Sequence, residues 1–132
     1  MLGSANRTAI EQMRRQELMT ATPAQLTVKL FQRLVLDLNR AQAAFTQGLP
    51  GNTHLVHAQA ILAELDATLD PAKWDGAEEL KAVYSYCMQT ISTANLNSDP
   101  DAVATAIELI TPVAAAFEDA SRAAPGAGQV IA

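Results

Sequence analysis

Residues 20–45 read TATPAQLTVKLFQRLVLDLNRAQAAF and predict one long helix. Thr22 can cap this helix, Pro23 suits its first position, and Gln25 stands where a capping box needs a partner. Neither Gly nor Pro follows Pro23 until Gly48, which leaves room for a helix of about 24 residues. One face, stepping by three and four residues, is apolar and consists of Thr27, Phe31, Leu34, Leu38, Ala41 and Phe45, whereas the opposite face carries Lys29, Arg33, Asp37 and Arg40. Because the apolar face is too wide for one neighbour to cover, this helix is predicted to contact at least two other helices, or one helix and a partner chain.

The composition of the chain is typical of a soluble protein. Its 132 residues are enough to bury a core without a metal or a disulfide, and Cys87 is the only cysteine. A net charge of −5 with only nine Lys and Arg argues against nucleic acid or an anionic membrane as a partner. The first twenty residues hold three Arg and two Glu, which argues against a signal peptide. No uncharged apolar run approaches the roughly 20 residues of a membrane span, so we expect no membrane insertion and a cytoplasmic location.

Turn and cap residues divide the rest of the chain into further helices. A short helix is predicted over residues 7–19, whereas residues 1–6 and 123–132 are expected to be disordered. The next helix follows the turn at residues 46–52, begins with Asn52 or Thr53 as its cap, and ends near residue 69.

Two more helices complete the chain. Asp75 is predicted to cap the first of them, with Glu78 in the capping-box position. Asp99 caps the second, with Pro100 as its first residue. Pro112 lies inside this last helix and is expected to kink it near residues 108–109.

Four long helices joined by short links predict an all-α fold. The expected arrangement is an antiparallel up-down-up-down four-helix bundle with a short extra N-terminal helix, forming a single domain over residues 1–132. The apolar seams of these helices are predicted to bury Leu34, Leu38, Leu62, Leu65, Leu80, Ile91, Ile107 and Ile110.

Residue patterns that carry catalysis or bind metals are weak in this chain. His54 and His57 share a helix edge, but zinc requires three or four ligands, so they are interpreted as solvated or partly packed, and no metal or cofactor is predicted. His57 could instead accept a phosphoryl group, since histidine phosphotransfer domains are also four-helix bundles, although no Lys follows it closely. Cys87 lies on an apolar seam and reads as an inert buried thiol. The residues therefore give no support for an enzyme.

The residues that remain unexplained are apolar ones outside the predicted seams. Leu36 lies in a polar helix face, and Tyr86 and Met88 flank a seam. Several such residues on neighbouring helices would form a groove for an apolar helix of a partner, and Met is common on adaptable binding surfaces.

Three ordered stretches resemble the FliS family of flagellin export chaperones. Residues 20–26 (TATPAQL) with Leu30-Phe31 are similar to the opening T-A-S-P-x-Q-L…L-Y of that family. Residues 58–65 (AQAILAEL) resemble its A-Q-x-I-I-x-E-L, and residues 83–86 (VYSY) with residues 94–96 (ANL) resemble its L-Y-D-Y…A-N-I. The resemblance covers roughly residues 18–118. Departures from the family pattern are Gln89-Thr90 in place of an Arg pair, Phe117 in place of a Trp, and an N-terminal segment without Tyr.

This resemblance implies an all-α cytoplasmic chaperone that binds the disordered C-terminal segment of flagellin. Binding would block premature polymerisation and keep flagellin ready for the type III export gate, a possible second partner. The predicted contact residues are Leu26, Val28, Val35, Leu36, Ile61, Leu65, Tyr84, Tyr86 and Met88. A movable N-terminal helix is predicted to guard the groove with Ile10, Met13, Leu18 and Met19. The alternatives are a histidine phosphotransfer-like signalling bundle and a structural homo-oligomeric bundle, and a homodimer is also compatible with the sequence.

Overall fold

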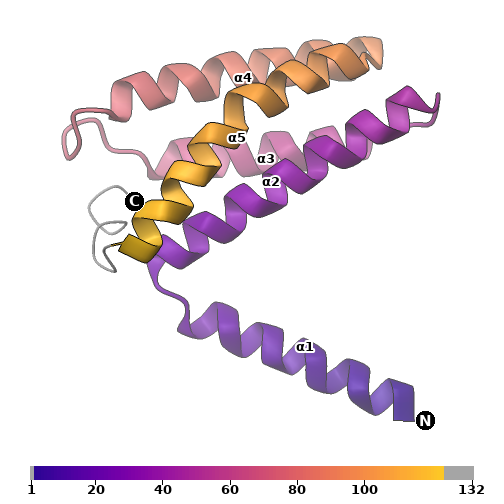
Figure 1. Ribbon diagram of the computed structural model, residues 1–132, viewed down its shortest axis with the longest axis vertical. Helices are drawn as coiled ribbons and strands as arrows, with labels where there is room; N and C mark the ends of the chain where they lie inside the picture. Colours follow the sequence, from indigo (N-terminus) through magenta and orange to yellow (C-terminus); the bar gives the residue numbers. More distant parts are fainter. Residues whose placement is uncertain (1, 124–132) are drawn as a thin grey trace.

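The chain folds into a helical bundle, as seen in a computed structural model that describes the backbone of residues 2–123 and the side chains of residues 7–16 and 21–123. Five helices and no strand occur within this range (Figure 1). They are α1 (Leu2–Thr20), α2 (Pro23–Thr46), α3 (Asn52–Thr68), α4 (Ala77–Asn97) and α5 (Pro100–Ala123). The all-α prediction is therefore confirmed.

Helix α2 is central to the packing, as its wide apolar face predicts. It packs against both α3 and α5, and α4 packs against the same two helices. The ring of Phe31 on α2 lies 4.9 Å from that of Phe117 on α5 and 6.4 Å from that of Tyr84 on α4, measured between centroids. Aromatic rings at these separations stabilise a core beyond the area that they bury.

The predicted core is confirmed except at one residue. Seven of the eight predicted side chains are buried, and Leu34, Leu38 and Leu62 are completely inaccessible. Ile107 is only half-buried and packs at the edge of the core. The reason is that α5 turns a narrower face inward, formed by Val103, Ala106 and Ile110 at steps of three and four residues.

Two of the predicted helix caps are present. At the head of α2, the Gln25 backbone N–H donates to Thr22 Oγ1 at 3.2 Å, and the Thr22 N–H donates to Gln25 Oε1 at 2.9 Å. This reciprocal pair is the predicted capping box. At the head of α5, Asp99 Oδ1 accepts hydrogen bonds from the backbone N–H groups of Asp101 at 2.9 Å and Ala102 at 3.4 Å.

The predicted caps of α3 and α4 are wrong. Helix α3 starts at Asn52 itself, so Gly51 holds the N-cap position and no side chain caps the helix. The Asn52 amide nitrogen donates instead across to α4, to the backbone oxygen of Asn95 at 2.9 Å and to its Oδ1 at 2.6 Å. Helix α4 starts at Ala77 rather than after Asp75, and it also has no side-chain cap. Gly76 precedes it and lies against the Trp74 ring so closely that a Cβ atom would approach the ring to 2.8 Å.

Helix α1 stands apart from the other four helices (Figure 1). It begins at Leu2, so residues 2–6, which were expected to be disordered, belong to a helix that no proline interrupts. Ile10 and Met13 on this helix are 51% and 62% exposed. The expected disorder at residues 124–132 concerns a range outside the described residues, whereas Ala123 is the last residue of α5.

Length and composition alone would allow α5 to cross a membrane. This stretch still carries a charge, because every segment of 18 residues within α5 includes Glu108. One such helix is weak evidence of a membrane span: α5 packs here against α2 and α4, and 17% of its most apolar 18 residues are buried.

Candidate functional site

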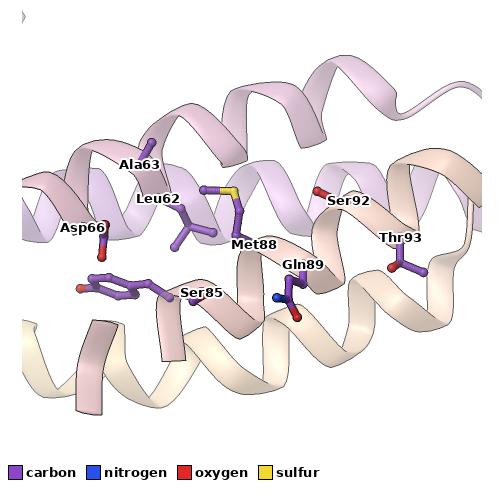
Figure 2. A pocket seen from close by; sticks show the side chains of 9 residues that line it. Leu62, Ala63, Asp66, Ser85, Met88, Gln89, Ser92 and Thr93 are labelled. Atoms are coloured by element: carbon purple, nitrogen blue, oxygen red, sulfur yellow. The ribbon is translucent and has the colours of Figure 1, made fainter. Parts of the chain in front are cut away.

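A groove of about 590 Å³ lies between α3 and α4 (Figure 2). Its lining residues come from both helices and are Leu62, Ala63, Asp66, Tyr84, Ser85, Met88, Gln89, Ser92 and Thr93. A volume of this size is typical of a binding site rather than of a packing defect. Apolar atoms provide most of the accessible lining, so the groove suits a partner with an apolar face.

The floor of the groove is apolar. Leu62 of α3 and Met88 of α4 lie next to each other there (Figure 2), Leu62 fully buried and Met88 half-buried. Tyr84 is also buried, and this burial raises the pKa of its hydroxyl above the ordinary value, with a further contribution from the nearby Asp66 carboxylate. Tyr84 is therefore neutral at physiological pH and adds an uncharged aromatic surface to the floor.

The rim of the groove is polar and almost uncharged. Exposed Ser85, Gln89 and Thr93 and half-buried Ser92 line it along α4. Asp66 of α3 is the only charged residue in the lining. An apolar floor with hydroxyl and amide groups at its edge matches a helix that has one apolar stripe and uncharged polar flanks.

Two interhelical contacts bound the groove along its length. At one end, Gln59 Nε2 donates to Ser92 Oγ at 3.0 Å. At the other end, Lys81 Nζ donates to the backbone oxygen of Asp66 at 2.9 Å and lies 3.3 Å from its Oδ1. Gln59 and Asp66 are seven residues apart on α3, so the open stretch between the contacts is about 10 Å, or two helical turns.

The predicted contact residues are only partly brought together. Tyr84 and Met88 line the groove, whereas Ile61 and Leu65 are buried in the core. The remaining five predicted residues are absent from the groove lining. Of these, Leu26, Leu36 and Tyr86 are exposed and Val28 and Val35 are half-buried.

The residues predicted to guard the groove lie on α1. Ile10 and Met13 are exposed there, on a helix that stands away from the bundle. The side chains of Leu18 and Met19 lie outside the described residues. In this arrangement α1 leaves the groove of its own chain uncovered.

The sequence interpretation missed the polar rim. Its α4 residues occur at positions 85, 89, 92 and 93, which follow one another at steps of about one helical turn and therefore share a face. These positions lie beside the apolar seam that contains Tyr84 and Ile91. A polar stripe adjacent to a seam was the available signal, but the same pattern is typical of an ordinary solvated helix surface.

A buried carboxylate joins α2 to α3 outside the groove. The Asp37 side chain is only 1% exposed, and its Oδ2 contacts Nδ1 of His57. Its Oδ1 lies 3.3 Å from Arg33 Nε. Asp37, predicted on the face opposite the apolar one, is thus buried, because α3 covers that side of α2 and supplies a polar partner. Since an ionised carboxylate only accepts, His57 donates through Nδ1.

The described residues were also compared with the requirements of a metal site and of a reactive thiol. No group of three or more His, Cys, Asp or Glu gathers among them in a way that could hold a metal ion. Cys87 is buried, and desolvation raises the pKa of its thiol to about 11, so it is protonated at physiological pH.

Comparison with protein-family models gives a match. The family model described as flagellar protein FliS matches residues 5–124, which is nearly the whole chain and includes both helices of the groove. A search of curated proteins finds no match.

Proposed function

Since the chain belongs to the FliS family of flagellar export chaperones, we propose that it binds the disordered C-terminal segment of flagellin in the cytoplasm. Binding prevents premature polymerisation of flagellin and keeps it competent for flagellar type III secretion, with the export gate as the next partner. The observation that carries this proposal is the groove between α3 and α4.

The groove fits an amphipathic segment of the client. A helix of two turns fills the stretch between the Gln59–Ser92 and Lys81–Asp66 contacts, and its apolar stripe covers Ala63 and Met88. The gain from burying this apolar surface offsets the ordering of a client segment that is disordered when free. In this proposal, α2–α5 form a single domain, an antiparallel up-down-up-down frame that holds the groove open before the client arrives.

Other exposed apolar residues extend the binding surface beyond the groove. Leu36 on α2 and Tyr86 on α4 are 40% and 55% exposed. A client that wraps around the bundle would cover such residues with segments before or after the helix in the groove. Gln89 keeps the rim uncharged, so the client flank that meets it is uncharged as well.

Calorimetry with a peptide of the cognate flagellin C-terminal segment tests this function. We expect a 1:1 complex, a negative heat-capacity change from apolar burial, and a gain of helical circular dichroism. Met88→Glu places a charge on the groove floor and should weaken binding by at least about tenfold, since one desolvated contact residue can be worth 2 kcal/mol or more.

Leu96→Glu is the matched control. Leu96 lies on the same helix, is 86% exposed, and does not line the groove, so its substitution should leave affinity unchanged. Wild-type protein that binds no flagellin peptide would remove the proposed function. Equal losses for Met88→Glu and Leu96→Glu would place the client elsewhere on the bundle.

A further inference from the structure

We propose that a second segment of the client, rich in Asp and Glu, binds along the exposed side of α2 while the helical segment fills the groove. The surface that binds it, called the basic face below, consists of Leu26, Lys29, Arg33, Leu36 and Arg40. This inference rests on the proposed function, because both segments belong to one flagellin chain.

The basic face is a continuous stripe on one side of α2. Its residues follow one another at steps of three and four positions, so they share a helix face that is about 21 Å long. All five side chains are exposed, and Leu26 and Leu36 are 38% and 40% accessible. Two exposed apolar side chains among three cations favour a partner that carries both apolar groups and carboxylates.

Positive charge concentrates on this face, although the chain as a whole is acidic. The net charge is −5, yet three of the six Lys and Arg that follow residue 20 belong to the basic face. Asp37 is the only acidic residue of α2, and it is buried against His57 rather than exposed beside the stripe. Lys29 and Arg40 make no ion pair with any residue that the structure describes. Both cations are therefore available to carboxylates of a partner.

The edge of α3 that borders the basic face adds little negative charge. His57 lies on this edge, with its side chain 48% exposed. Glu64 follows two turns later and is the only acidic residue on the edge, since Asp66, the other acid of α3, lines the groove on the opposite side. Because Asp37 meets His57 and the connecting turn covers residues 47–51, Glu64 lies toward the Lys29 end of the stripe. Arg40, near the turn, is the cation farthest from it.

A client can reach the basic face from the groove by crossing α3. This helix packs on both α2 and α4, so the groove and the basic face lie on either side of it (Figure 1). The outward side of α3 presents Val56, Ala60, Ala63 and Ala67, which are all exposed and uncharged. The diameter of a helix with its side chains is about 10–12 Å, a distance that about four extended residues span. Neighbouring segments of one client chain can therefore occupy both surfaces.

The two surfaces select segments of different chemistry. The groove has an almost uncharged rim and binds an apolar helix with uncharged flanks, whereas the basic face binds carboxylates spaced around apolar side chains. Charges act over about 10 Å at about 0.1 M salt, so the basic face attracts the client before the groove is filled. Its main effect is therefore on the association rate.

Stopped-flow and calorimetric titrations of the full-length protein with the cognate flagellin C-terminal peptide test this inference. The variant Lys29→Gln/Arg40→Gln removes two cations that neither line the groove nor contact Asp37. Lys73→Glu is the matched control, because it changes the net charge by the same amount at an exposed position between α3 and α4. A second peptide carries Asn and Gln in place of every Asp and Glu.

The double variant should bind the unmodified peptide at least about fivefold more slowly than the wild type at about 0.1 M salt, whereas Lys73→Glu should slow binding at most about twofold. The difference should disappear at about 1 M salt, where the Debye length is about 3 Å. The neutralised peptide should bind the wild type and the double variant at the same, lower rate. Leu36→Asp should weaken binding more than Leu96→Asp, because Leu96 lies outside both surfaces.

Equal association rates for the wild type and the double variant, equal losses for the double variant and Lys73→Glu, or equal rates for the two peptides would each overturn the inference. Binding of the flagellin peptide by the wild type, together with its loss in Met88→Glu, would in those cases leave the proposed function intact. Wild-type protein that binds neither peptide would refute the proposed function and this inference with it.

Discussion

Removing the His57 imidazole should destabilise the fold by about 1.5–3 kcal/mol, the range for a hydrogen bond to a charged group. The basis is the Asp37 carboxylate, which is 1% exposed between α2 and α3 and keeps only two partners, His57 and Arg33. Arg33 should matter less. Its Nε lies 3.3 Å from Asp37 Oδ1 without a hydrogen bond, whereas His57 bonds to Oδ2, so Arg33→Ala should cost at most about 1 kcal/mol.

The double variant His57→Ala/Arg33→Ala provides the sharper test. It leaves a buried carboxylate without a partner, a situation that costs about 3–5 kcal/mol, whereas the two single losses together amount to at most about 4 kcal/mol. A loss above the measured sum of the single variants would show that the two partners compensate for each other. Adding Asp37→Asn to this double variant removes the charge and should recover at least about 1 kcal/mol of the loss.

Urea unfolding followed by far-UV circular dichroism near neutral pH measures each free energy of unfolding. Each 1 kcal/mol should also lower the melting temperature by about 3–5 °C for a chain of this length. Two results together would refute the idea that the carboxylate is ionised and depends on these two partners. The double variant would lose no more free energy of unfolding than the sum of the two single variants, and adding Asp37→Asn would recover none of that loss.

Three further predictions concern the core, the cap and pH. Leu34→Ala should cost about 2–5 kcal/mol in urea unfolding, because Leu34 is fully inaccessible, and a loss below about 0.5 kcal/mol would be incompatible with that burial. Thr22→Ala should cost about 1 kcal/mol, because it leaves the Gln25 N–H at the head of α2 unpaired, and unchanged thermal unfolding would contradict this. Burial raises the pKa of the Cys87 thiol from 9.0 to about 11 and also raises that of Tyr84, so the folded state holds these protons more tightly than the unfolded state. The stabilisation is therefore complete below pH 9 and is lost as the pH rises through about 11, and a free energy of unfolding that stays constant across this range would disprove the assignment.

Helix caps that depend only on residues within three positions of each other were predicted correctly from the sequence. The capping box of Thr22 and Gln25 and the cap at Asp99 need only local backbone geometry, and both are present. Asn52 looks equally suited to cap α3, but the helix starts at Asn52 itself, with Gly51 at the N-cap position, and the Asn52 side chain bonds to Asn95, which is 43 residues away. Local chemistry therefore identifies a possible cap, whereas the residue at which the helix begins decides whether the cap forms.

Periodicity located helix faces but not the elements that cover them. The spacing of Asp37 with Arg33 and Arg40 places it on a polar face, and only the position of His57 on α3 explains why it is buried. The groove shows the same limit. Leu62 and Met88 were readable as seam and flank residues, whereas the opening between them depends on how α3 and α4 pack. Its rim residues Gln89 and Ser92 cannot be distinguished from solvated positions until that packing is known.

The contact between α2 and α5 brings the two ends of the bundle together. Phe31 in the first half of α2 meets Phe117 in the second half of α5, with ring centroids 4.9 Å apart. The four helices therefore form a closed ring of contacts, from α2 through α3, α4 and α5 back to α2. This ring depends on which helices lie side by side and not on which helix comes first in the chain. A circular permutant that joins the end of α5 to the start of α2 through a short linker, and opens the chain within residues 47–51, should keep every interhelical seam. In such a molecule the chain of the core would begin at α3, so α1 would no longer lead directly into α2.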